Sequence, residues 1–117
     1  MTDRDPDCLF CRIVADEIPS DRVFEDDEVI AFLDIAPRAP THVLVIPRRH
    51  IPDAHVMTDA DGPLVAKLFA VMRRIADEAG LESGYRVVTN VGPAAGQSVA
   101  HLHFHLLGGR TMSWPPG

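Results

Sequence analysis

The sequence predicts an α+β domain, a mostly antiparallel sheet of about five strands with one long and one short helix. Short β-prone segments separated by turn residues indicate the strands, and one long amphipathic segment indicates the helix. The connections between most strands are short, which favours antiparallel pairing. The chain has 117 residues, of which 46% are hydrophobic and 24% charged, as in one globular domain that buries a core.

The first half of the chain is predicted to hold a short helix and three strands. Residues 1–7 are polar, and we expect them to be mobile. Apolar residues then recur at helical spacing, and Pro19 lies beyond the end of that helix. Asp26 and Asp27 form a turn between two strands of a hairpin, and Pro47 stops the third strand. The expected elements are a helix within 8–17 and strands over 22–25, 29–34 and 41–46.

The second half is predicted to hold the long helix and two more strands. Thr58 or Asp61 can cap the start of the helix, and Pro63 fits only in its first turn. Gly80 and Leu81 form a C-terminal cap. The apolar stripe of the helix consists of Leu64, Leu68, Met72, Ile75 and Ala79, widened by Val65, Phe69 and Val71. The expected elements are a helix over 59–79, a strand over 85–90, a loop over 91–96 and a strand over 99–107.

Three histidines alternate with apolar residues in the last predicted strand. Because the alternation has period two, His101, His103 and His105 are expected on one face and the apolar residues in the core. Those apolar residues are Ala100, Leu102, Phe104 and Leu106. Same-face neighbours lie roughly 6.5–7 Å apart, so a phosphoryl group fits between two imidazoles. Three imidazoles are costly to bury without partners, which predicts a functional site. A zinc site on these imidazoles is the competing interpretation.

The pattern His-apolar-His-apolar-His-apolar-apolar resembles the signature of the histidine-triad (HIT) superfamily of nucleotide hydrolases. The tail over 108–117 resembles the terminus of the Hint branch, the histidine-triad nucleotide-binding proteins. The resemblance also covers residues 24–27, 31–35, 39–42, 45–50 and 84–88. It implies a single HIT domain over 1–117 that pairs as a homodimer, with long helices packed together and the two sheets continuous. Packing of the long helix on the chain's own sheet explains its apolar stripe equally well.

The resemblance implies a two-step displacement at phosphorus. His103 would attack the α-phosphorus and form a nucleotidyl-histidine, which water then hydrolyses. A neutral imidazole is a good nucleophile when its other nitrogen is held by an acceptor, and a neighbouring imidazole can donate the leaving group's proton. His105 would take that second role. Related nucleotidyltransferases carry glutamine at this position, so His105 favours hydrolysis. Ser98 would be the hydroxyl beside the phosphate.

The resemblance also implies a nucleotide pocket. Asp34 would bind the ribose hydroxyls, and apolar side chains would enclose the base. Leu33 stands where the family often has histidine, which changes the rim. None of these residues offers a purine-specific hydrogen bond, so base selectivity is expected to be modest. The expected pocket residues are Phe10, Phe32, Asp34, Ile35, Asn90, Gly96, Gln97, Ser98, His103 and His105. Without the resemblance, the apolar members fit an ordinary core as well. Trp114 would reach the partner subunit's site.

Cys8 and Cys11 have the spacing of half a zinc site, although two such cysteines are often simply buried. Bacterial relatives with this Cys-x-x-Cys are similar in binding zinc together with two histidines, which here are His50 and His101. The implied Cys2His2 site is closed and therefore structural, and no catalytic metal is expected. The remaining histidines, His42 and His55, are expected in surface or loop positions.

The charge and the ends of the chain limit the possible partners. The net charge of −6 provides no basic surface for nucleic acid. No apolar run is long enough for a bilayer, and the acidic N-terminus is no signal peptide, so we expect a cytoplasmic protein with reduced thiols.

The expected activity is hydrolysis of the P–N bond of purine nucleoside phosphoramidates, of the adenosine 5′-monophosphoramidate type. The same residues also fit a dinucleoside polyphosphate hydrolase, against which the Hint-like tail argues. They fit, in addition, a nucleotide-binding regulatory module with incidental turnover and a metal hydrolase built on the triad itself.

Overall fold

The computed structural model describes residues 4–117, so the expected mobility of residues 1–3 lies outside the described part of the chain. Residues 4–7 contact the first helix and the loop after it. Arg4 forms an ion pair with Glu17, and the backbone N–H of Asp5 donates to Cys11 Sγ at 3.4 Å.

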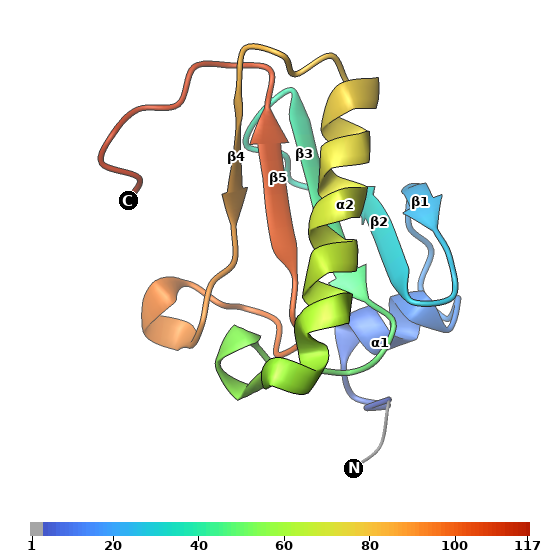
Figure 1. Ribbon diagram of the computed structural model, residues 1–117. Helices are drawn as coiled ribbons and strands as arrows, with labels where there is room; N and C mark the ends of the chain where they lie inside the picture. Colours follow the sequence, from blue (N-terminus) through green and yellow to red (C-terminus); the bar gives the residue numbers. More distant parts are fainter. Residues whose placement is uncertain (1–3) are drawn as a thin grey trace.

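Five strands form one antiparallel sheet, as predicted, in the spatial order β1-β2-β3-β5-β4 (Figure 1). Their bounds are β1 Arg22–Glu25, β2 Val29–Leu33, β3 Thr41–Pro47, β4 Tyr85–Val88 and β5 Phe104–Gly108. β1 and β2 form the predicted hairpin, whose turn is fixed by Asp26 Oδ1 accepting the backbone N–H groups of Glu28 and Val29 at 2.8 Å each. Because β5 lies between β3 and β4, the histidine segment enters the interior of the sheet.

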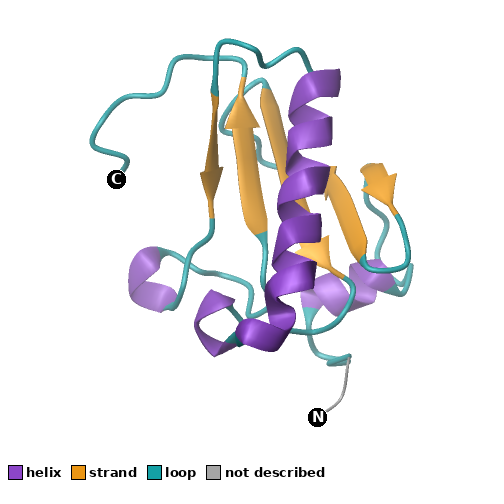
Figure 2. Ribbon diagram, in the orientation of Figure 1, coloured by secondary structure: helices purple, strands orange, loops and turns teal. Residues whose placement is uncertain are grey.

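Helices cover both faces of this sheet (Figure 2). α2 (Gly62–Glu78) crosses the front face in this view, and the short α1 (Leu9–Val14) lies behind the sheet. Three 3-10 turns complete the regular structure, namely η1 Ala54–Val56, η2 Asp59–Asp61 and η3 Pro93–Ala95. No helix within residues 4–117 combines the length and the apolar character needed to cross a membrane.

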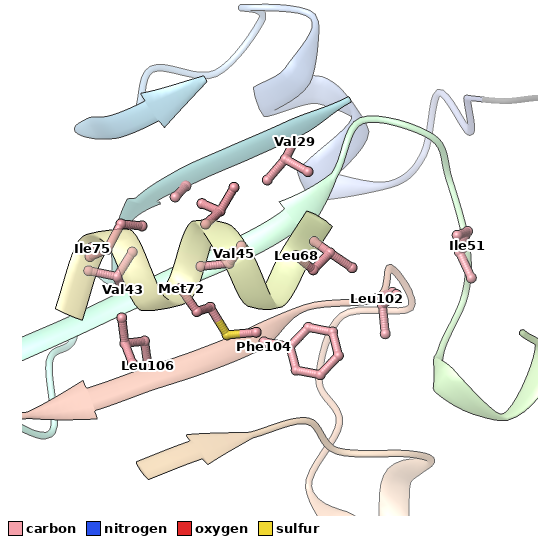
Figure 3. Packing of buried hydrophobic residues seen from close by; sticks show 12 residues of the cluster. Val29, Val43, Val45, Ile51, Leu68, Met72, Ile75, Leu102, Phe104 and Leu106 are labelled. Atoms are coloured by element: carbon pink, nitrogen blue, oxygen red, sulfur yellow. The ribbon is translucent and has the colours of Figure 1, made fainter. Parts of the chain in front are cut away.

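α2 and the front face of the sheet enclose the main core (Figure 3). Alternate residues of β2, β3 and β5 point toward the helix, as the period of two requires. The fully buried members include Val29, Val45, Leu68, Leu102 and Leu106. The helical stripe is largely confirmed, but Ala79 is exposed because it lies at the end of α2, and Ala76 is buried instead.

α1 packs on the back face with a second, smaller core. The buried residues of this cluster are Cys8, Phe10, Cys11, Ile13, Ile30, Phe32, Leu44 and Ile46. Ile30, Phe32, Leu44 and Ile46 occupy the strand positions between those that face α2. The sheet therefore separates an α2 face from an α1 face.

The ends of α2 are close to the prediction. Its expected first turn is the 3-10 turn η2, and the α-helix itself starts at Gly62, with Pro63 in its first turn. Asp61 Oδ2 accepts the backbone N–H of Thr58 at 2.9 Å. At the other end Gly80 has a φ of +70°, and the backbone N–H groups of Gly80 and Leu81 donate to carbonyls of the last turn at 3.2 and 3.0 Å. This is the predicted glycine cap.

The last strand differs from the prediction, because β5 begins at Phe104 instead of Val99. Continuing the ladder from the Val45–Phe104 pair would set Pro47 opposite Leu102. Proline has no N–H for that ladder, and Leu102 N–H donates instead to the carbonyl of Ile51 at 2.6 Å. The expectation that Ala100 lies in the core is also wrong, because it precedes the strand and is exposed. The strand predicted over 85–90 likewise ends earlier, at 88.

Candidate active site and metal centre

The three histidines lie on the α1 face, as the alternation predicted, although only His105 belongs to the regular strand. Leu102, Phe104 and Leu106 pack against α2, so the intervening side chains point the other way. His101 and His103 are buried and His105 is half-buried.

His103 is held in the orientation that a nucleophilic imidazole needs. Its Nδ1 lies 2.7 Å from the backbone carbonyl oxygen of His101. A carbonyl only accepts hydrogen bonds, so this contact assigns the proton to Nδ1 and leaves the Nε2 lone pair free. The edge of the Phe10 ring packs against the imidazole at a centroid distance of 5.1 Å, and His105 lies at the same distance on another side.

His105 is oriented by a fourth histidine, His42 on β3. The backbone N–H of Arg38 donates to His42 Nδ1 at 3.0 Å, so neutral His42 carries its proton on Nε2. That nitrogen lies 2.9 Å from His105 Nδ1 and 3.4 Å from Asp34 Oδ2. His42 Nε2–H therefore donates to His105 Nδ1, which leaves His105 with its proton on Nε2. His103 thus offers a lone pair on Nε2, and the neighbouring His105 carries a proton on its own Nε2.

The expected surface position of His42 is therefore wrong. The side chain is buried and belongs to the site, whereas His55 is exposed as expected. His42 shares the strand face of Leu44, which pairs with His105 in the sheet register. The even spacing of His42 and Leu44 was visible in the sequence, but the pairing of β3 with β5 was not.

Burial favours the neutral forms of His42 and His105, because it lowers the pKa of both groups. It lowers the pKa of His105 to about 4, an effect to which the neighbouring His103 and His42 add and which Asp34 opposes. Burial also lowers the pKa of His42, and again Asp34 opposes the shift. Both groups therefore start in the neutral form that the hydrogen-bond pattern requires.

A cavity of about 720 Å³ lies beside the histidines. Four of the predicted nucleotide-binding residues, Phe10, Phe32, Asp34 and Ile35, line it. The other lining residues are Leu9, Ile13, Ile18, Pro19, Ser20, Asp21, Leu33 and Leu44. The rings of Phe10 and Phe32 pack edge to face at 5.6 Å. Phe10 packs against His103 and Asp34 lies 3.4 Å from His42, and because both residues line the cavity, it is adjacent to the histidines.

The loop before the histidines carries the remaining predicted residues. The side chain of Gln97 stabilises this loop, because its Oε1 accepts Gly92 N–H at 2.8 Å and its Nε2 donates to Pro52 and Val99 carbonyls. Gly96 ends η3 with a φ of +95°, which favours glycine. Ser98 is exposed, Asn90 is half-buried, and within residues 4–117 neither side chain forms a hydrogen bond to a histidine. Their roles remain predictions.

The predicted metal ligands converge on one point. Cys8, Cys11, His50 and His101 offer ligand atoms that all lie within 4.8 Å of one another. Cys11 Sγ is 3.3 Å from His50 Nδ1, and His101 Nδ1 is 3.4 and 3.6 Å from the two sulfur atoms. Tetrahedral zinc, with bonds of about 2.3 Å to sulfur and about 2.0 Å to nitrogen, sets such ligands about 3.5 Å apart. The donor set therefore fits zinc.

The surroundings of these ligands match a closed metal centre. His101 Nε2–H donates to the carbonyl of Pro47 at 2.8 Å, which leaves Nδ1 as the free lone pair beside the sulfur atoms. Burial raises the pKa of Cys8 to about 11, so without a cation that thiol stays protonated, and metal binding would release its proton. Neither cysteine forms a disulfide.

Comparisons with known proteins agree with this fold. The HIT domain matches residues 15–112. An uncharacterized HIT-like protein of Synechococcus elongatus is 50% identical over 111 residues, covering 95% of this chain and 97% of that protein. The 14 kDa zinc-binding protein of Zea mays is 45% identical over 121 residues, covering 97% of this chain and 90% of that protein.

A solved relative gives the same result. The HIT family hydrolase from Legionella pneumophila superposes with a TM-score of 0.93 at 50% identity, covering 95% of this chain and all of that one. The chain belongs to the HIT domain family.

Proposed function

We propose that this protein is a nucleotide-binding hydrolase that cleaves purine nucleoside phosphoramidates, of the adenosine 5′-monophosphoramidate type. The observation that carries the proposal is the hydrogen bond from His103 Nδ1 to the carbonyl of His101 at 2.7 Å. It leaves the Nε2 lone pair free for attack beside an imidazole that carries a proton. Solved relatives from Legionella pneumophila and Clostridium thermocellum, both described as HIT family hydrolases, support hydrolytic chemistry.

In the first step, His103 Nε2 attacks the α-phosphorus and the P–N bond to the leaving amine breaks. The electron pair of that bond stays with the amine, which takes a proton from His105 Nε2. The negative phosphoryl group beside His105 favours its imidazolium form, which offsets the effect of burial. In that form His105 Nδ1 also carries a proton, and His42 Nε2–H donates instead to Asp34 Oδ2, 3.4 Å away. After the transfer to the amine, His105 is neutral. Such proton donation is worth about 10²- to 10⁴-fold in rate.

In the second step, water attacks the phosphorus of the nucleotidyl-histidine. His105, now without its Nε2 proton, accepts a proton from the water, and the bond from phosphorus to His103 Nε2 breaks. The products are the nucleoside monophosphate and the regenerated histidine pair. Ser98 lies in the preceding loop and would bind the phosphate or the leaving group.

The nucleotide would lie in the cavity beside the histidines. Phe10, Phe32 and Ile35 offer apolar contacts to the base, and Asp34 offers a carboxylate to the ribose hydroxyls. Gly96 and Gln97 would contribute backbone N–H groups, and Asn90 its amide.

The four converging ligands would hold a structural zinc ion. Bound there, zinc would cross-link α1 to the segments around His50 and His101 and would take no part in the displacement. We expect one zinc per chain by elemental analysis, and none in Cys11→Ala. His55→Ala removes an exposed histidine outside the cluster and should keep its zinc. Zinc well below one equivalent in the metal-replete wild type would contradict the assignment.

A homodimer is part of the proposal. Phe69 on α2 is 48% exposed although it packs on the core residue Phe104, and Tyr85 on the edge strand β4 is 43% exposed. Such apolar groups favour association with a second copy. Trp114 in the C-terminal tail is 82% exposed and would then reach the partner subunit's site. We also propose a cytoplasmic location, which suits two unpaired cysteines.

The test compares adenosine 5′-monophosphoramidate with diadenosine tetraphosphate as substrates. We expect wild type to prefer the phosphoramidate, His103→Ala to be inactive, and His55→Ala to match wild type. Mass spectrometry of rapidly quenched wild type should find the nucleotidyl adduct on His103. Preference for the dinucleotide would favour a polyphosphate hydrolase. Tight AMP binding without turnover of either substrate would favour a regulatory module.

A further inference from the structure

We propose that Asp21, assisted by Ser20, reads the base of the nucleotide and selects guanine over adenine. This inference rests on the proposed function, because it assumes that the cavity holds a purine nucleotide. It concerns the end of the cavity farthest from the histidines.

The sheet register fixes which end of the cavity takes the base. His105 pairs with Leu44, Leu44 with Phe32, and Phe32 with Arg22, so these residues form one row across β5, β3, β2 and β1. Three strand spacings separate the ends of this row by about 14 Å. A phosphate bound at His105 therefore directs the base toward the segment just before Arg22.

That segment brings unused polar groups to a largely apolar cavity. Ser20 Oγ is the only buried side-chain oxygen or nitrogen without a hydrogen-bond partner within residues 4–117. Asp21 is exposed at the rim of the cavity, and its carboxylate forms no hydrogen bond or ion pair within residues 4–117. Its backbone carbonyl accepts Leu33 N–H at 2.9 Å, which fixes the position of the residue. Both residues line the cavity. Buried polar groups normally have partners, and because no protein group partners this hydroxyl, it is free to donate to a bound ligand.

The chemistry of these groups matches guanine. The cavity lining contains two carboxylates, those of Asp21 and Asp34, and no basic side chain. Guanine presents two adjacent donors, N1–H and the N2 amino group, which one carboxylate can accept together. Its O6 can accept the hydroxyl proton of Ser20. Adenine presents one donor beside the acceptor N1, and a carboxylate repels that lone pair.

The test is the affinity of the wild-type protein for GMP and AMP by calorimetry, together with kcat/KM for the guanosine and adenosine phosphoramidates. A hydrogen bond to a charged group predicts about tenfold tighter binding of GMP. Asp21→Ala should remove the preference. Asp21→Asn should shift it toward AMP, because an amide offers adenine both a donor and an acceptor. Ser20→Ala should weaken GMP binding by a smaller factor.

Asp27→Ala is the matched control, because Asp27 is an exposed acidic residue in the β1–β2 turn and does not line the cavity. It should keep the GMP preference of wild type. Equal affinity of wild type for GMP and AMP, or an unchanged preference in Asp21→Ala, would overturn the inference. Hydrolysis of both phosphoramidates at equal rates would do so while leaving the proposed function intact. Absence of nucleotide binding in wild type would instead contradict the proposed function.

Discussion

The hydrogen bond between His42 and His105 allows a quantitative prediction for His42→Ala. His42 Nε2 lies 2.9 Å from His105 Nδ1, and both imidazoles are neutral because burial lowers their pKa values. The bond holds His105 in the tautomer with its proton on Nε2. In His42→Ala, His105 keeps both of its ring nitrogens, but the hydrogen bond that fixes the orientation of its imidazole is lost.

The size of the effect follows from the type of bond that is lost. A neutral hydrogen bond contributes about 0.5–1.5 kcal/mol, which corresponds to about a 2- to 13-fold loss of kcat. His105→Ala removes the proton donor itself and should cost about 10²- to 10⁴-fold. We therefore expect the order His103→Ala, His105→Ala, His42→Ala from most to least severe.

The assay is kcat at saturating phosphoramidate for the three variants, with circular dichroism to verify folding. His42→Gln serves as the conservative variant, because its amide N–H can still donate and should recover part of the lost rate. The pKa of His105 should also rise in His42→Ala, because a neighbouring group that lowers it is gone. A loss in His42→Ala as large as in His105→Ala would refute an orienting role, and so would an unchanged kcat.

Three further predictions concern stability. Leu68 is fully buried under α2, so Leu68→Ala should lower the free energy of unfolding by about 2–5 kcal/mol in urea titrations, and a loss below about 1 kcal/mol would contradict this packing. A Cβ on Gly108 would lie 2.6 Å from Leu81 Cδ1. Gly108→Ala should therefore lower the free energy of unfolding by about 1–3 kcal/mol in wild type and by less in a Leu81→Ala background. Equal losses in both backgrounds would exclude the clash. The pKa of His105 is lowered to about 4 in the folded state, against about 6.5 in the unfolded chain, so its contribution to stability is complete above pH 6.5 and is lost as the pH falls toward 4. Urea midpoints at pH 7.5 and pH 5 measure this, and greater stability at pH 5 would contradict the assignment.

The elements that depend on local signals could be predicted from the sequence. The hairpin around Asp26, the start of α2 near Thr58 and the cap at Gly80 all rest on residues within one turn of each other. The alternation around His103 also predicted correctly which side chains point away from the core. These signals are short-range, so no knowledge of the other strands was needed.

The features that the sequence did not predict all depend on contacts between distant segments of the chain. β5 begins late because Leu102 N–H donates to Ile51, a partner that alternation alone cannot reveal. His42 joins the site only because β3 pairs with β5. Ser20 and Asp21 line the cavity because the segment before β1 runs beside the end of β2, where Leu33 N–H donates to Asp21.

One face of the sheet carries the residues of the candidate site and the other carries the main core. Evolution can therefore change the chemistry and the stability of this protein separately. Residues that support folding, such as Leu106, point toward α2, while their immediate neighbours in the chain, such as His105, lie on the opposite face of the sheet. Substitutions on the two faces share few direct contacts, so their free-energy effects should be close to additive. A lineage could therefore alter the lining of the cavity and compensate for lost stability with substitutions under α2. Because histidines and core residues alternate along the chain, the ligand specificity of the cavity can change while the fold stays the same.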